Sequence, residues 1–216
     1  MINSAKTLIL AMLLLLAAPA WAEKPLVLAF GDSLTAGYGL DPGESYPARL
    51  EHALAEQGLE VEIANAGVSG DTSSGGRARL AWVLDGLDRP PALVILALGA
   101  NDALRGIDPL ITKRNIAAMI ALLKQRDIPV LLAGMLAPPN MGADYGAAFN
   151  SLYPDLAAAH DVAFYPFLLD GVAAQPGLNQ ADGIHPNAEG VSVMVEGLLP
   201  MVKACLQGEM ASCHQN

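Results

Sequence analysis

Cysteine and basic side chains are scarce in this sequence of 216 residues. The two cysteines are Cys205 and Cys213, and neither lies in the glycine-rich or histidine-paired surroundings of a reactive thiol, which excludes cysteine catalysis. Lysine and arginine number 12 against 22 aspartate and glutamate residues, a formal net charge of −10. A surface of that charge repels nucleic acid phosphates and anionic membranes, so we expect neither as a partner.

Long apolar runs are also few. The run from Leu8 to Ala18 is too short to span a bilayer, which takes ~20 residues. Lys6 precedes this run and Ala20-Trp21-Ala22 follows it, so the segment has the basic start, apolar centre and small-residue cleavage site of a secretory signal peptide. We expect cleavage after Ala22, with an uncleaved membrane anchor as the alternative. The remaining residues, 23–216, then form one periplasmic or secreted domain.

An oxidising compartment also bears on the two cysteines. Cys205 and Cys213 are close in sequence near the C-terminus, and such a pair can close a small loop as a disulfide. Two unbonded tail residues are the alternative.

Apolar, β-rich runs recur along the chain and alternate with helical patterns. The runs are Leu26 to Gly31, Val61 to Ala64, Ala92 to Leu98, Pro129 to Met135 and Val162 to Phe164. Helical periodicity precedes the later runs, as in Tyr46 to Gln57 and Thr112 to Gln125, and a last helix is expected from Ala188 to Cys205 with Asn187 as its cap. The first, third and fourth runs are nearly all apolar, as parallel strands covered on both faces are. We predict an α/β fold, a three-layer α/β/α sandwich with a flavodoxin-like parallel sheet of about five strands.

Polar residues follow the predicted strands, where such sheets bind their ligands. Ser33 follows the first strand, while Asp182 and His185 lie just before the last helix. A serine is a weak nucleophile unless a base removes its proton, and a neutral imidazole oriented by a carboxylate is the commonest base. We therefore predict Ser33 as nucleophile, His185 as base and Asp182 as the acid that orients the base.

Acyl transfer also requires hydrogen-bond donors for the oxyanion of the tetrahedral intermediate. The backbone N–H groups of Ser33 and Gly70 and the side-chain amide of Asn101 can supply them, since each follows a predicted strand. Gly70 suits this task because a residue without Cβ lets the backbone approach the substrate. Asp32 and Asp102 are interpreted as structural neighbours of these groups.

At these residues the chain resembles the GDSL, or SGNH, hydrolase family, whose four blocks centre on Ser, Gly, Asn and His. The blocks occur in order from Gly31 to His185. The stretches Asn65 to Thr72 and Leu104 to Gly106 are similar to the thioesterase I/lysophospholipase/arylesterase branch of bacterial periplasmic enzymes. The resemblance implies the same catalytic and oxyanion roles for the residues named above, and no metal or organic cofactor.

In that branch the loop after the fourth strand shapes the acyl pocket. Here the loop is expected from Leu136 to Tyr145, with Pro138, Pro139 and Met141 lining an acyl channel. We thus expect a monomeric, exported serine esterase that hydrolyses small-molecule or lipid acyl esters, with acyl thioesters as further substrates. A carbohydrate or peptidoglycan O-acetylesterase is the alternative among enzymes, and a non-catalytic ligand-binding module is the alternative from another class.

Overall fold

A computed structural model of the protein describes residues 23–208. The expected signal peptide, residues 1–22, lies outside this range, and so does Cys213 of the expected disulfide, so both stay predictions. Within residues 23–208, no helix combines the length and the apolar character that a membrane crossing requires.

Five parallel strands form one sheet in the order β2-β1-β3-β4-β5. Every residue of β1, β3 and β4 is buried, whereas the edge strands β2 and β5 are partly exposed. The nearly unbroken apolar runs in the sequence therefore correspond to the three inner strands, as expected for strands covered on both faces. The strands are Leu26–Gly31 (β1), Glu62–Gly67 (β2), Leu93–Ala97 (β3), Val130–Ala133 (β4) and Ala163–Tyr165 (β5).

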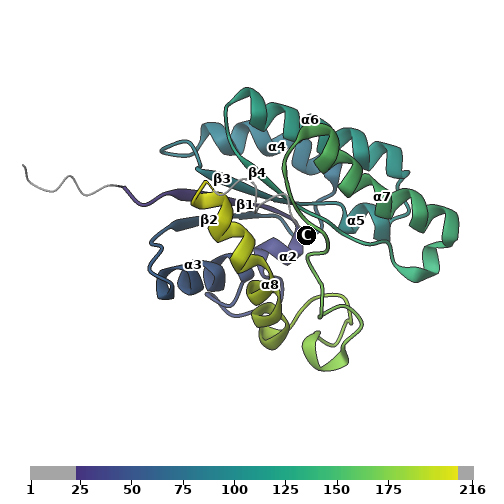
Figure 1. The fold of residues 1–216 in the computed structure, drawn as a ribbon. Coiled ribbons are helices and arrows are strands. Elements are labelled where there is room, and N and C mark those ends of the chain that lie inside the picture. Colours follow the sequence, from purple (N-terminus) through teal and green to yellow (C-terminus); the bar gives the residue numbers. More distant parts are fainter. Residues whose placement is uncertain (1–22, 209–216) are drawn as a thin grey trace, which may run out of the picture.

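Helices cover both faces of the sheet, so the predicted three-layer sandwich is confirmed (Figure 1). On one face α3 packs against α8, and on the other α6 packs between α4 and α7. Short helices α2 and α5 directly follow β1 and β3, and two 3-10 turns lie in later connections. The bounds are Ser33–Ala36 (α2), Tyr46–Glu56 (α3), Ser73–Asp85 (α4), Ala100–Leu104 (α5), Pro109–Gln125 (α6), Pro139–Met141 (η1), Ala143–His160 (α7), Pro176–Leu178 (η2) and Ala188–Leu206 (α8).

The packed faces of the helices follow their apolar periodicity. In α6, Ile116, Met119, Ile120 and Leu123 are all buried in the core between this helix and the sheet. Because these residues recur every three or four positions, they form one stripe along the helix. The last helix begins where its cap was predicted, since the Asn187 side chain accepts a hydrogen bond from the backbone N–H of Gly190 at 2.9 Å.

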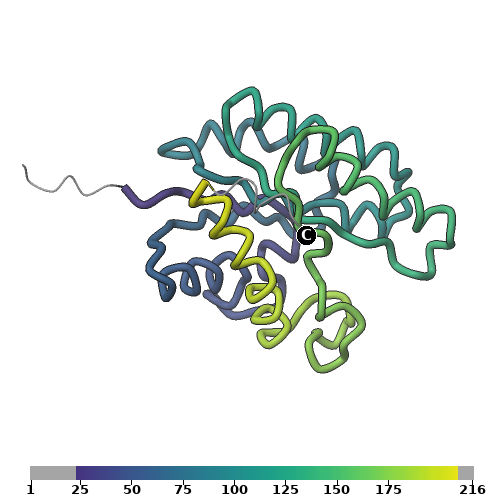
Figure 2. The backbone as a smooth tube through the Cα atoms, in the orientation of Figure 1, coloured from purple at the N-terminus to yellow at the C-terminus, as the bar shows by residue number. Residues whose placement is uncertain are grey.

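One connection differs from the prediction. The loop expected from Leu136 to Tyr145 ends earlier, because α7 begins at Ala143. Gly142, with a φ of 87°, forms the turn that ends the loop, and Asp144 in the first turn of α7 lies where a negative charge favours a helix start. The connection from β5 to α8 contains only η2 and appears as the light green loop at the lower right of Figure 2.

The strand order places a switch point between β1 and β3. The chain leaves β1 to form the edge strand β2 and then crosses back to β3 on the other side of β1. In sheets of this order, ligands bind beyond the C-terminal ends of the two central strands. Ser33 follows β1 and Asn101 lies at the start of α5 after β3, so both residues lie at this point.

Candidate active site

Ser33 is the first residue of α2, directly after β1. Asp32 caps this helix, because its Oδ1 accepts a hydrogen bond from the backbone N–H of Leu34 at 3.0 Å. The chain can turn so sharply because residue 31 is glycine: a Cβ on Gly31 would lie 2.1 Å from Oγ1 of Thr35. The turn holds Ser33 at the strand end with 8% of its surface exposed.

His185 and Asp182 meet Ser33 in one chain of hydrogen bonds. The Nε2 atom of His185 lies 2.8 Å from Oγ of Ser33, and its Nδ1 atom lies 2.7 Å from Oδ2 of Asp182. The other carboxylate oxygen of Asp182 accepts the backbone N–H groups of Ile184 and His185 at 2.9 and 3.0 Å. The three residues predicted as nucleophile, base and acid are therefore brought together by the fold.

Gln180 and Tyr38, which the sequence analysis did not single out, hold the loop that contains Asp182 and His185 in place. The Gln180 amide donates to the backbone oxygens of Tyr38, near Ser33, at 2.7 Å and of Pro186 at 2.9 Å. The ring of Tyr38 packs on the imidazole of His185, with ring centroids 4.7 Å apart. Because Tyr38 and Gln180 lie far apart in sequence, no local pattern could have identified the pair.

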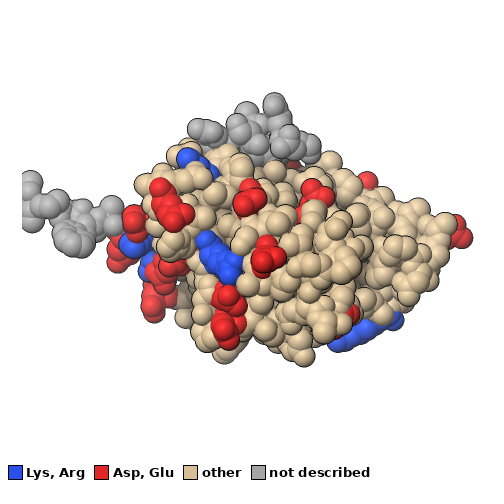
Figure 3. Space-filling model, turned by 90° about the horizontal axis from the view of Figure 1, so that it is seen from below, with Lys and Arg blue, Asp and Glu red and all other residues tan. Residues whose placement is uncertain are grey.

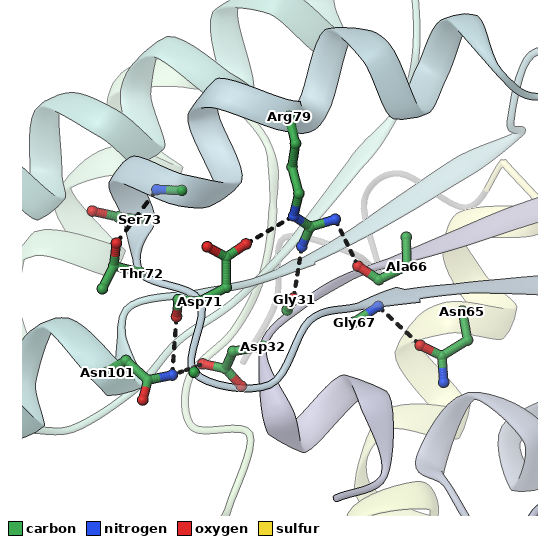
Figure 4. A network of polar contacts seen from close by, with 12 residues as sticks. Gly31, Asp32, Asn65, Ala66, Gly67, Asp71, Thr72, Ser73, Arg79 and Asn101 are labelled. Atoms are coloured by element: carbon green, nitrogen blue, oxygen red, sulfur yellow. Dashed lines mark hydrogen bonds and ion pairs between the residues drawn. The ribbon is translucent and has the colours of Figure 1, made fainter.

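The residues predicted as oxyanion donors lie on neighbouring loops and helices. Gly70, with a φ of 81°, lies between β2 and α4, and the Arg105 guanidinium donates to its carbonyl at 2.8 Å. The Asn101 amide nitrogen donates to the backbone oxygen of Asp71 at 2.9 Å and lies 3.4 Å from Oδ2 of Asp32 (Figure 4). The Gly70–Asp71 loop is thus tied to the helix that carries Asn101.

Asp102 and Asp32 have the supporting contacts that were expected of them. The fully buried Asp102 carboxylate accepts from the backbone N–H of Ser73 at 2.8 Å and from the Ser73 and Thr112 hydroxyls. It therefore joins α4, α5 and α6 behind the site. Asp32 lies between the N–H of Leu34 and the Asn101 amide, and it does not replace Asp182 as the partner of His185.

Asp182 and Asp32 have opposite electrostatic surroundings. The hydrogen bond with His185, and then the two backbone N–H bonds, lower the pKa of Asp182 from 3.8 to about 2. Burial raises the pKa of Asp32 from 3.8 to about 6, although the Leu34 N–H and the charge of His185 act in the other direction. Asp182 is consequently ionised at neutral pH and can orient a histidine.

An apolar cavity of about 450 Å³ opens beside Ser33, Asn101 and His185. Pro138 and Pro139 line it together with the segment from Met135 to Ala137, and residues of the β5–α8 connection close the opposite side. Met141, also predicted to line an acyl channel, ends the η1 turn with its methyl group near Gly106 and is not among the residues around this cavity, so its role stays a prediction.

Charged side chains are unevenly spread over the face of the molecule drawn in Figure 3. The acidic residues gather mainly at the left of this face, and most of its right half, toward which the strands run in Figure 1, is uncharged. Among residues 23–208, no group of three or more His, Cys, Asp or Glu side chains could hold a metal ion. The site brings together a serine hydroxyl, an imidazole, a side-chain amide and apolar surface.

A parallel sheet of this order, with a serine and a histidine joined at its switch point, defines an α/β hydrolytic enzyme of the serine class. The GDSL-like lipase/acylhydrolase family matches residues 29–193, most of the described chain. Esterase TesA of Pseudomonas aeruginosa is 41% identical over 185 residues, which cover 86% of this chain and 91% of that protein. An arylesterase of Vibrio mimicus is 42% identical over 168 residues, 78% of this chain and 82% of that protein.

The solved structures agree with these sequence relatives. The crystal structure of AlinE4, an SGNH-hydrolase family esterase, is 48% identical with a TM-score of 0.73 and covers 85% of this chain and 97% of its own. The chain belongs to the GDSL-like lipase/acylhydrolase family. Both the resemblance seen in the sequence and the class of serine hydrolase acting on ester bonds are confirmed.

Proposed function

We propose that the protein is an exported esterase that cleaves acyl esters through a covalent acyl-enzyme on Ser33. The observation that carries this proposal is the chain of hydrogen bonds from Ser33 through His185 to Asp182 at the mouth of an apolar cavity. A module that only binds a ligand needs the cavity but not an oriented imidazole on a serine hydroxyl.

The first half of the reaction acylates Ser33. Asp182 accepts a hydrogen bond from the Nδ1–H of His185, which keeps the proton on Nδ1 and leaves Nε2 unprotonated and facing the hydroxyl. Nε2 takes the hydroxyl proton as Oγ attacks the acyl carbon, and the carbonyl π electrons move onto the carbonyl oxygen. When the tetrahedral intermediate collapses, the bond to the leaving oxygen breaks and the imidazolium protonates that oxygen. A thioester would react in the same way, with sulfur as the leaving atom.

The second half repeats these steps with water. His185 removes a proton from the water as its oxygen attacks the acyl carbon, and it returns that proton to Ser33 when the acid leaves. The oxyanion of both intermediates would be bound by the N–H groups of Ser33 and Gly70 and by the Asn101 amide, and removing one such donor typically costs about 2.7–4 kcal/mol of barrier. A hydrogen bond from the Asn101 amide to the backbone oxygen of Asp71 supports this role, because it restricts the side chain.

The cavity bears on the choice of acyl group. Its volume of about 450 Å³ lies within the usual range for small-molecule sites, and its lining is mostly apolar. An acetyl group would leave most of that surface in contact with water, whereas a medium-length or aromatic acyl group would bury it. We therefore expect aryl and alkyl esters of such acids to be the preferred substrates, with Pro138 and Pro139 among the acyl-binding residues.

Covalent labelling tests the proposal directly. A fluorophosphonate should modify the folded protein once, at Ser33, and Ser33→Ala should remove both the label and the hydrolysis of p-nitrophenyl esters. The matched control is Ser151→Ala, at an exposed position of α7. Absence of a Ser33 adduct would rule out the acyl-enzyme. A strict preference for acetylated sugars over longer acyl esters would instead favour the O-acetylesterase alternative.

A further inference from the structure

Arg79 of α4 contacts four residues close to the proposed oxyanion site. Its Nε donates to Oδ2 of Asp71 at 2.7 Å, and its two terminal nitrogens donate to the backbone oxygens of Ala66 and Gly31, each at 2.9 Å (Figure 4). The guanidinium also lies 4.0 Å above the ring of Phe30, a favourable position for a cation. One side chain thus joins α4 to the ends of β1 and β2.

The two carbonyls bound by Arg79 belong to the segments that carry the reacting groups. Gly31 is the last residue of β1 and precedes Asp32 and Ser33. Ala66 lies at the end of β2, just before the loop that contains Gly70. The guanidinium therefore fixes the position of the end of β1, which leads to Ser33, relative to the loop after β2, which contains Gly70.

Asp71 transmits the position of Arg79 to Asn101. Its carboxylate binds the guanidinium, while its backbone oxygen accepts the Asn101 amide at 2.9 Å. Residue 75 has to be glycine for this arrangement, since a Cβ on Gly75 would lie 1.8 Å from Oδ1 of Asp71. The side chains of Arg79 and Asp71 are only 18% and 11% exposed, so solvent screens this ion pair less than a surface pair.

We propose that Arg79 is a positioning residue of the oxyanion hole. Through Asp71 it fixes the position of the Asn101 amide, and through the ends of β1 and β2 it fixes the distance between Ser33 and Gly70. This inference rests on the proposed function. Arg79 does not line the cavity, so its effect on the reaction passes through other residues. Loss of Arg79 should therefore destabilise the tetrahedral states more than it weakens the binding of the substrate.

Arg79→Lys is the sharpest perturbation, because lysine keeps the charge but lacks the planar fork that contacts three acceptors at once. A shift of the oxyanion donors by ~1 Å costs about 100-fold in rate, so we expect kcat for a p-nitrophenyl ester to fall by about that factor with KM changed little. The affinity for an alkyl boronic acid, which forms a tetrahedral adduct on a serine, should fall by a similar factor. The affinity for the product carboxylic acid should stay unchanged.

Arg77→Lys is the matched control. Arg77 lies two residues earlier on the same helix, and its guanidinium donates to the Asn115 side chain at 3.2 Å, away from the Gly70–Asp71 loop. This variant should keep the kcat and the boronic acid affinity of the unaltered protein. Guanidinium ions at millimolar concentration should restore part of the activity of Arg79→Ala and have no effect on Arg77→Ala.

The results separate this inference from the proposed function. An unaltered protein without ester turnover or Ser33 label would defeat the proposed function itself. An unchanged kcat in Arg79→Lys, with or without a lowered melting temperature, would overturn the positioning role and leave the proposed function standing. If Arg79→Lys does not fold, Asp71→Asn keeps the shape of that side chain and provides the test: it should lower kcat and boronic acid affinity together, and unchanged values would also overturn the proposal.

Discussion

Replacing the buried Asp32 by asparagine should change how the stability of the protein depends on pH. The Asp32 carboxyl is 1% exposed, and its burial, with smaller contributions from the carboxylates of Asp71 and Asp102, raises its pKa to about 6. Asparagine has nearly the same shape, and its amide oxygen can still accept the N–H of Leu34. The substitution therefore removes the titration and leaves the packing and the helix cap in place.

The sign follows from proton binding. Between the unfolded pKa of 3.8 and the folded value of about 6, the folded state binds more protons at Asp32 than the unfolded state does. The contribution of Asp32 to the free energy of unfolding is therefore fully present below pH 3.8 and is lost as the pH rises through about 6. A shift of this size corresponds to about 3 kcal/mol, since one pKa unit is worth about 1.4 kcal/mol.

Urea unfolding at pH 4 and at pH 7 measures this difference. The stability of Asp32→Asn relative to the unaltered protein should be about 2 kcal/mol more favourable at pH 7 than at pH 4, because pH 4 lies just above the unfolded pKa of 3.8 and part of the full effect is already lost there. Asp88→Asn, at an exposed position, is the control and should give no such change. A relative stability of Asp32→Asn that is the same at both pH values would refute the claim that Asp32 ionises at a cost in the folded protein.

Two further predictions concern the serine and the turn before it. Ser33→Ala and His185→Ala should each abolish most ester hydrolysis. Because the two groups act as a unit, the double variant should have a kcat/KM hardly lower than that of either single variant. Additive losses would contradict a shared proton transfer. Gly31→Ala should lower the melting temperature and the activity together. The added Cβ would lie 2.1 Å from Oγ1 of Thr35 and 2.6 Å from the backbone oxygen of Ala97. A stable, active variant would show that the turn can relax.

The inner part of the fold was predictable because burial on both faces leaves a plain composition signal. β1, β3 and β4 are nearly pure apolar runs, and the structure has them at the centre of the sheet. The start of α7 was not predictable in the same way. Pro138, Pro139 and Gly142 indicate a loop, but its last residue depends on the positive φ of Gly142 and on packing from Phe149 onward, which no local pattern specifies.

The residues of the site also differ in whether the sequence alone could identify their contacts. Asp182 and His185 are three positions apart, and the loop between them closes through local hydrogen bonds, so their pairing could be proposed from spacing. Arg79 contacts Gly31, Ala66 and Asp71, which are separated from it by 8 to 48 positions. An arginine on a helix is by default interpreted as a surface residue, and only the folded chain reveals that its guanidinium lies among strand ends.

Two aspartates lie close to the Ser33–His185 pair, and their surroundings rather than their proximity decide which one serves the histidine. Asp182 accepts three hydrogen bonds, and the low pKa that results keeps it charged when His185 gains a proton. Asp32 is buried, its oxygens face Leu34 and Asn101, and its raised pKa makes its charge costly near neutral pH. A negative charge at Asp32 would also repel the oxyanion that we propose beside Asn101. Two residues of the same type are therefore suited to different roles: Asp182, with three donors around it, can orient a base, whereas the buried Asp32 caps a helix.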